Sequence, residues 1–270
     1  MKTSVAQQSR PVAANPDRTV RSSSYNQALT AISIVIPAYN EEQRLPASLA
    51  AIASYLSRKN YLQAEIIVVD DGSSDRTSAV AAEFEQPGVN VIVLGNPGNR
   101  GKGYSVRHGI LEASGDWILF TDADLSAPIE ELDKLMWEAR RLDAEVVIGS
   151  RAIDRSLIGV HQSPFREYAG RVFNLLMRVL TGLPFWDTQC GFKLYSRKAA
   201  REVFSRLRIE RFGFDAEALF IAKRRGFKIL EVPVRWNHVA GTKVSMIGDS
   251  VGMFLDLLRI RVNQIKGCYR

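Results

Sequence analysis

The stretch ISIVIPAYNEE (residues 32–42) starts as a nearly continuous apolar run and ends in polar residues. Similar short runs rich in β-branched residues follow: EIIVVDD (65–71), NVIVLG (90–95), WILFTD (117–122) and EVVIGSR (145–151). They alternate with helix-like segments at 41–59, 75–85, 101–114 and 128–141. Because strands covered on both faces read as continuous apolar runs, the pattern predicts a doubly wound, Rossmann-like α/β fold with a mainly parallel sheet and helices on both faces.

Polar side chains gather where these apolar runs end. Residues 37–42 follow the first run, Asp70 and Asp71 close the second, Asp122 and Asp124 follow the fourth, and Arg151 follows the fifth. In open α/β sheets ligands bind beyond the carboxyl ends of the strands. The sequence therefore predicts one site at that edge of the sheet.

Composition limits the class of protein. The chain has 270 residues, a formal net charge of +7 and a pI near 9.5, which favours an anionic partner such as a phosphate ligand, a membrane surface or nucleic acid. Its two cysteines, Cys190 and Cys268, have no metal-binding spacing, so a disulfide scaffold and a zinc site are both disfavoured and reduced thiols in a cytosolic protein are expected.

The sequence suggests three segments. Residues 1–30 have no apolar run and are expected to be a disordered tail, residues 31–245 to be the folded domain, and residues 246–270 to be an amphipathic helix. No stretch reaches the roughly 18 uninterrupted apolar residues of a spanning helix. Any membrane contact is therefore expected to be peripheral.

Two familiar phosphate-binding motifs are absent. The turn PAYNEE (37–42) lacks the glycines of a dinucleotide-binding fingerprint, and NPGNRGKGYS (96–105) departs from the P-loop pattern. The glycines of the second segment still permit a tight loop before a helix whose first amides would face an anion. A simple turn explains them equally well.

The pair Asp122 and Asp124 is of the type that binds a hard divalent cation such as Mg²⁺ or Mn²⁺. An aspartate pair at a strand end can also cap the next helix, and Pro128 is suited to the first turn of one. The metal interpretation is favoured because four carboxylates at one edge of a basic protein need cations or hydrogen-bond donors to offset their repulsion.

Taken together, five motifs resemble family 2 glycosyltransferases of the GT-A fold: IPAYNEE (36–42), VVDDGSSD (68–75), GNRGKG (98–103), TDADLS (121–126) and GSR (149–151). DTQCGFKLY (187–195) and RFGFDAEALFIA (211–222) are similar to the dolichyl-phosphate β-glucosyltransferases and, more loosely, to the mannosyltransferases. This resemblance covers about residues 32–265. It implies an inverting, Mg²⁺- or Mn²⁺-dependent transfer of a sugar, glucose from UDP-glucose before mannose or another hexose, onto polyprenyl or dolichyl phosphate.

The resemblance also implies roles for individual residues. The catalytic set is Asp124, Arg151 and Arg166, in which Asp124 binds the metal with Asp122 beside it and the arginines hold the acceptor phosphate. The nucleotide-sugar side comprises Pro37, Tyr39, Glu41, Val69, Asp71, Asp122, Ala123 and Lys243. The acceptor side comprises Gln189, Asp215 and Glu217. Two positions depart from the pattern, because Ser126 replaces a frequent glutamine and Asn237 replaces a frequent arginine.

A lipid acceptor predicts a membrane-facing surface. Residues 165–186 carry large apolar side chains and arginines, and residues 251–266 place an apolar stripe beside basic residues. Basic amphipathic helices suit an anionic bilayer, so we expect peripheral association with the cytoplasmic face of a membrane. Packing of both stripes on the protein core is the alternative.

Other functions fit less well. A processive synthase would need Q-x-x-R-W, and the chain has VPVRW (232–236) without spanning helices. A non-catalytic nucleotide- or nucleic-acid-binding module explains the basic charge but not the strand-end carboxylates, so no nucleic-acid partner is expected. A hydroxyl acceptor would need a general base, and no residue is clearly placed to act as one.

Overall fold

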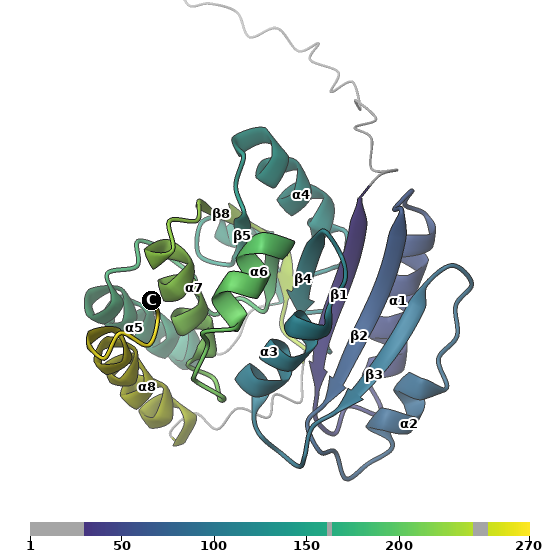
Figure 1. The fold of residues 1–270 in the computed structure, drawn as a ribbon, viewed down its shortest axis with the longest axis horizontal. Coiled ribbons are helices and arrows are strands. Elements are labelled where there is room, and N and C mark those ends of the chain that lie inside the picture. The colour runs from purple at the N-terminus through teal and green to yellow at the C-terminus, as the bar shows by residue number, and fades with distance from the viewer. Residues whose placement is uncertain (1–29, 161–163, 240–247) are drawn as a thin grey trace, which may run out of the picture.

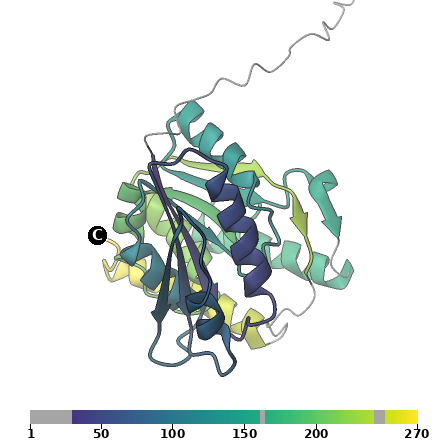
Figure 2. The same cartoon turned by 90° about the vertical axis from the view of Figure 1, so that its right-hand side faces the viewer.

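The computed structural model describes residues 30–160, 164–239 and 248–270, with side chains throughout except at 164–169, 171–173 and 248–251. In this part of the chain one sheet has the order β3-β2-β1-β4-β7-β5-β8, and the short strands β6 and β9 pair beside it (Figures 1 and 2). The strands are β1 (Ala31–Ala38), β2 (Gln63–Asp70), β3 (Asn90–Gly95), β4 (Trp117–Thr121), β5 (Val146–Ser150), β6 (Ile158–Val160), β7 (Phe192–Ser196), β8 (Ile229–Pro233) and β9 (Trp236–Asn237). The α-helices are α1 (Leu45–Ser57), α2 (Thr77–Ala82), α3 (Lys102–Glu112), α4 (Glu131–Leu142), α5 (Pro164–Thr181), α6 (Arg197–Phe204), α7 (Phe214–Arg224) and α8 (Gly248–Ile265).

The pairing of the strands confirms the mainly parallel sheet. β1 is parallel to both β2 and β4, β2 is parallel to β3, and β5 is parallel to β8. β7 is antiparallel to β4 on one side and to β5 on the other, so β4 and β5 run in the same direction. The carboxyl ends of β1, β2, β4 and β5 therefore lie at one edge of the sheet. The polar residues that follow these strands gather at that edge.

Alternate residues of each central strand enter two different cores. In β1, Ile34 and Ile36 pack with α1 and α4, whereas Val35 packs on the opposite face with α3. α2 covers the first face, and α6, α7 and α8 extend the second. Since side chains alternate across a sheet and both faces are covered, the strands have no polar face, which explains their continuous apolar sequence.

The C-terminal segment packs on the domain. α8 lies beside α5 (Figure 1), and its Leu257 and Ile260 are fully buried. Beyond α8, the Tyr269 hydroxyl donates to Oε1 of Glu217 at 2.6 Å. The sequence analysis separates residues 246–270 from the folded domain at 31–245. In the structure, α8 of that last segment shares the core of the domain. Residues 1–29, the greater part of the predicted tail, lie outside the described residues.

Candidate functional site

The loops that follow β1 and β2 are joined to each other by hydrogen bonds. The Asn40 amide donates to Oγ of Ser73 at 2.9 Å, and the Glu41 amide donates to Oγ1 of Thr77 at 2.7 Å. Asn40 itself has a φ of 53°, in the left-handed region that asparagine tolerates better than most residues. The polar segment PAYNEE is therefore held in one conformation by the segment that follows Asp70 and Asp71.

The Asp71 carboxylate lies against the loop that precedes α3. It accepts hydrogen bonds from the Asn96 side chain at 2.8 Å, the Arg100 amide at 2.9 Å and the Gly101 amide at 2.7 Å. The two backbone amides directly before α3 therefore face the protein's own carboxylate, which accounts for the conformation of this loop without an external phosphate.

Asp122 forms an ion pair with Lys102, whose Nζ lies 2.6 Å from its Oδ1. Burial disfavours the charge of Lys102, but Asp122 and Asp215 outweigh burial and raise its pKa above the ordinary value. The Asp122 carboxylate also lies so close to Gly191 that a Cβ at that position would collide with it. The glycine of the CGF sequence is therefore required by the position of Asp122.

Asp124 occupies a tight turn after β4. Its Oδ1 accepts a hydrogen bond from the Ser126 amide at 3.0 Å, and Leu125 between them has a φ of 45°. A leucine in the left-handed region is strained, and such strain gathers at functional sites. The Ser126 carbonyl accepts the Asn237 amide at 2.8 Å, so the two positions that depart from the family pattern are neighbours.

The donor set at this edge suits Mg²⁺ or Mn²⁺ held partly by substrate. Within the described ranges, the Ser126 amide is the single hydrogen-bond donor to the Asp124 carboxylate, and Oδ2 is left for a ligand. No cluster of three or more metal-binding side chains occurs among the described residues. Because Mg²⁺ typically binds one or two carboxylates together with substrate phosphates, these aspartates fit such an ion.

Arg151, directly after β5, is held by Asp187. Its Nε donates to Oδ2 at 2.7 Å, its Nη2 donates to Oδ1 at 2.9 Å, and its backbone amide donates to Oδ2 at 3.0 Å. Burial opposes the charge of Arg151, but the buried Asp187 outweighs it and raises the pKa of Arg151 above its usual range. The guanidinium stays charged and its plane is fixed.

Asp215, at the start of α7, forms a buried ion pair with Lys193 of β7. Nζ and Oδ1 lie 2.5 Å apart, and Nζ also donates to the Cys190 carbonyl. The pair adjoins Asp122, since Lys102 interacts with both aspartates. The predicted acceptor-side residue Asp215 thus contributes to the charge balance beneath the strand-end carboxylates.

The carboxylate of Glu217, the other predicted acceptor-side acid, is bound inside the protein. It is fully buried, and its carboxylate accepts hydrogen bonds from the amides of Arg208 and Ile209 and from the Tyr269 hydroxyl. These contacts account for both oxygens. The hydrogen bonds give Glu217 an internal role, joining α7 to the chain terminus, instead of the expected contact with an acceptor.

Glycosyl transferase family 2 matches residues 33–204 of the chain. The chain belongs to this family. A dolichyl-phosphate beta-glucosyltransferase of Trichomonas vaginalis is 38% identical over 240 residues, 86% of this chain and 73% of that protein. The dolichyl-phosphate beta-glucosyltransferase of Homo sapiens is 38% identical over 253 residues, 88% of this chain and 77% of that protein.

Solved structures agree on the GT-A fold of this family 2 glycosyltransferase. Glucosyl-3-phosphoglycerate synthase from Mycobacterium tuberculosis, in complex with Mn²⁺, UDP and glucosyl-3-phosphoglycerate, has a TM-score of 0.63 and 20% identity, covering 87% of this chain and 79% of that one. Mannosyl-3-phosphoglycerate synthase from Rubrobacter xylanophilus has a TM-score of 0.63 and 18% identity, covering 88% and 74%.

Two of the predicted nucleotide-side residues at the end of β1 and in the loop after it are accessible to a ligand. Pro37 is half-buried and Tyr39 is 38% exposed. Glu41 is buried and forms a two-point ion pair with Arg44, with distances of 2.6 and 2.7 Å. The pKa of Arg44 is raised by this hydrogen bond and further by Asp124 and Asp122, so Arg44 lies within electrostatic reach of the aspartate pair.

Two other predicted nucleotide-side residues are buried. Val69 is fully buried, and its side chain lies under Gly109 of α3 so closely that a Cβ there would meet it at 2.8 Å. Only the backbone of Val69 is therefore left to meet a ligand. Ala123 is also buried, and its carbonyl accepts Oγ of Ser48 at 2.6 Å. Ala123 thus fixes the turn between the two aspartates.

The remaining predicted residues are placed only in part. The Gln189 amide donates to Oδ1 of Asp187 at 3.2 Å, next to Arg151. Arg166 lies in α5, in the portion without described side chains, and Lys243 lies outside the described residues.

The sequence interpretation of this glycosyltransferase missed the partners of its charged residues. Lys102, Asp187 and Lys193 each form an ion pair with a predicted site residue, and Arg44 lies near the aspartate pair. One signal was available, because Lys193 stands between the apolar residues Phe192 and Leu194, and a lysine buried among apolar neighbours needs an acidic partner. The other partners carry no such signal.

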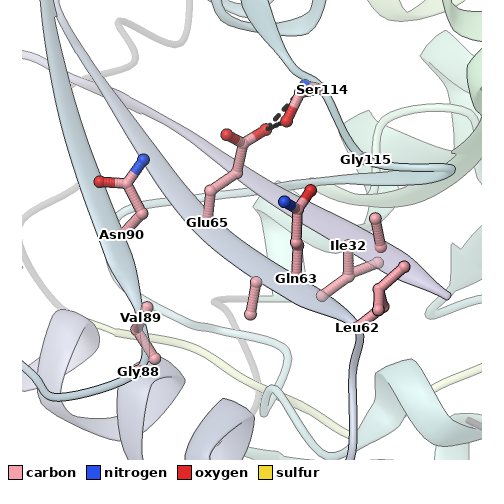
Figure 3. A pocket seen from close by; sticks show the side chains of 11 residues that line it. Ile32, Leu62, Gln63, Glu65, Gly88, Val89, Asn90, Ser114 and Gly115 are labelled. Atoms are coloured by element: carbon pink, nitrogen blue, oxygen red, sulfur yellow. Dashed lines mark hydrogen bonds between the residues drawn. The ribbon is translucent and has the colours of Figure 1, made fainter. Parts of the chain in front are cut away.

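A cavity of about 490 Å³ lies at the opposite edge of the sheet, where β1 and β2 begin (Figure 3). Glu65 lines it and accepts hydrogen bonds from Ser33 at 2.5 Å and from the amide and hydroxyl of Ser114 at 2.7 and 3.0 Å. These bonds tie β2 to β1 and to the turn before β4. The cavity contains none of the predicted site residues.

Proposed function

We propose that this glycosyltransferase moves glucose from UDP-glucose to polyprenyl or dolichyl phosphate with inversion, giving a β-linked lipid-phosphate sugar. The names of its relatives support this substrate pair. The observation that carries the proposal is the meeting of Asp122 and Asp124 with the fixed Arg151 fork at one edge of the sheet. The two aspartates suit a metal-bound diphosphate, and the arginine suits the phosphate of the acceptor.

On the donor side, Asp124 would hold Mg²⁺ or Mn²⁺ with Asp122 beside it. When bound, this ion stabilises negative charge on the leaving diphosphate. Asp122 is already balanced by Lys102, so Asp124 is the freer of the two ligands. Tyr39 is proposed to contact the nucleoside directly. Asp71, which is buried, is proposed to support the nucleoside site by fixing the loop before α3, and Lys243 is proposed to assist at the diphosphate.

On the acceptor side, Arg151 and Arg166 would hold the lipid phosphate. A phosphate monoester with a second pKa near 6 is largely dianionic at neutral pH, so its oxygen attacks the anomeric carbon without losing a proton. The new bond forms as the bond between that carbon and the UDP oxygen breaks, and UDP departs with the electron pair. The side chains therefore align two reactants and offset charge, with no general base required.

The direct test is transfer by the purified full chain. With Mg²⁺ or Mn²⁺ present, we expect label from UDP-glucose to enter polyprenyl phosphate, and neither component alone to give product. UDP-galactose, GDP-mannose and other labelled nucleotide sugars serve as matched donors, and a polyprenyl alcohol serves as the matched acceptor. Consumption of none of the donors in the presence of the lipid phosphate would contradict the proposal, whereas a preference for GDP-mannose would identify a mannosyltransferase.

The glycosyltransferase is also proposed to bind a membrane peripherally, at the cytoplasmic face. No described helix is long and apolar enough to cross a bilayer. The neighbouring helices α5 and α8 instead expose large apolar side chains: Leu175, Leu176, Val179, Phe254, Leu255, Leu258, Val262 and Ile265. Arg259 and Arg261 of α8, and Lys266 directly after it, are exposed as well. Apolar and basic side chains together suit an anionic lipid surface, and the free thiols suit a reducing compartment.

Vesicle sedimentation tests this surface. We expect the chain to bind phosphatidylglycerol vesicles and to release at high salt, because part of the attraction is electrostatic. Replacing Leu258, Val262 and Ile265 together by serine should weaken binding at least about tenfold, since each buried leucine-sized side chain contributes about 1.5–3 kcal/mol. Leu62→Ser is the matched control, because Leu62 is 61% exposed at the opposite sheet edge. Equal losses in both variants would contradict this surface.

A further inference from the structure

The ion pair between Arg151 and Asp187 leaves one corner of the guanidinium for a ligand. Asp187 accepts from Nε and Nη2, while Nη1 forms no hydrogen bond with any residue in the described ranges. The guanidinium carbon lies 5.5 Å from the ring centre of Trp236, which packs against it. An arginine side chain normally loses considerable rotational freedom when it binds a phosphate, and here that freedom is already lost.

Asp187 is in turn fixed by Glu231 of β8. Oε1 of Glu231 accepts from the Asp187 amide at 2.7 Å and from the Ser150 hydroxyl at 2.7 Å, and Oε2 accepts from the Trp186 amide at 2.9 Å. Ser150 is the residue before Arg151. Glu231 therefore connects the end of β5 to the segment that carries Asp187. Through these hydrogen bonds the Glu231 side chain fixes the backbone beside Arg151 and the backbone of Asp187 relative to each other.

We infer that Asp187 is a positioning residue that orients Arg151 toward the acceptor phosphate, with Glu231 holding Asp187 in place. This inference rests on the proposed function of Arg151. A second effect of Asp187 has the opposite sign, because its negative charge weakens the attraction of the pair for a phosphate. Removal of the Asp187 charge therefore separates two roles. If Asp187 orients Arg151, phosphate binding weakens, and if Asp187 only neutralises Arg151, phosphate binding tightens.

The test is binding of decyl phosphate, measured by calorimetry on the full chain, together with steady-state kinetics. Asp187→Asn should weaken decyl phosphate binding about tenfold and raise KM for the lipid phosphate similarly, while KM for UDP-glucose stays within about twofold. Glu231→Gln, which keeps the ion pair, should change binding in the same direction but less. In an Arg151→Lys background, where the fork is absent, Asp187→Asn should add less than about twofold.

Glu65→Gln is the matched control, because Glu65 is equally a buried carboxylate that accepts several hydrogen bonds, at the far edge of the sheet. It should lower the thermal midpoint comparably without changing phosphate binding. Tighter or unchanged binding by Asp187→Asn, additive losses in the Arg151→Lys background, or no binding by the unmodified chain would each overturn the inference. Binding of decyl phosphate without sugar transfer would instead contradict the proposed function and leave the positioning test intact.

Discussion

Turnover of UDP-glucose is expected to fall by about a thousandfold or more when Asp124 is replaced by alanine. Its carboxylate receives one hydrogen bond among the described residues, from Ser126, so Oδ2 is left for a metal. Loss of this ligand leaves charge on the departing diphosphate unbalanced. Initial rates over a series of Mg²⁺ and Mn²⁺ concentrations measure the effect, and paramagnetic resonance of Mn²⁺ with UDP should report weaker metal binding.

Glu112→Ala is the control for this substitution. Glu112 is an exposed carboxylate at the distal end of α3, and its removal should leave the rate within about twofold. Asp122→Asn should have a smaller effect than Asp124→Ala, because Lys102 already offsets the Asp122 charge. Full activity of Asp124→Ala at saturating Mg²⁺ would disprove its role as a metal ligand.

Lys193→Met is expected to lower the free energy of unfolding by about 3–5 kcal/mol, since it removes one partner of a buried ion pair. Asp215 is 5% exposed and would keep Lys102 as its nearest described cation. Urea denaturation at pH 7, followed by tryptophan fluorescence, measures the change. An exposed lysine provides the control, so Lys198→Met should change stability by less than about 0.5 kcal/mol.

The pH dependence of the Lys193→Met variant has a defined sign. Burial raises the pKa of Asp215 in the folded state, against the opposing effect of Lys193, and loss of Lys193 should raise it further. The folded state then binds a proton more tightly than the unfolded state, so stability should recover as the pH falls toward 5 and decline as the pH rises. Adding Asp215→Asn should recover most of the loss at pH 7. A deficit independent of pH would indicate a packing defect instead of an unpaired charge.

The sequence predicted the first five strands and four helices because each has a strong local pattern. The strands between residues 31 and 150 are continuous apolar runs, and the structure confirms them and the intervening helices. β7 was not among the predicted strands, since nothing local in FKLYS (192–196) specifies insertion between β4 and β5. That pairing joins residues remote in sequence, so only the assembled sheet reveals it.

The sequence predicted the position of the amphipathic stripes and offered two orientations, facing a membrane or packing on the protein core. In α8, Phe254, Leu255 and Leu258 of the expected stripe are exposed, and the side chains that pack on the core are Leu257 and Ile260. Periodicity reports that a helix has an apolar face but does not report whether protein or another surface covers it. The contacts of α8 with α5 and α7 decided this point.

The sequence by itself determined that several of the predicted site residues share one edge of the sheet. Parallel strands bring their carboxyl ends together, so Asp71, Asp122, Asp124 and Arg151 had to meet wherever the parallel order held. The tertiary structure alone decided how those charges are tolerated: Lys102 pairs with Asp122, Asp187 with Arg151 and Lys193 with Asp215. Ion pairs form between side chains that folding brings within about 4 Å, and no spacing along the chain specifies those meetings.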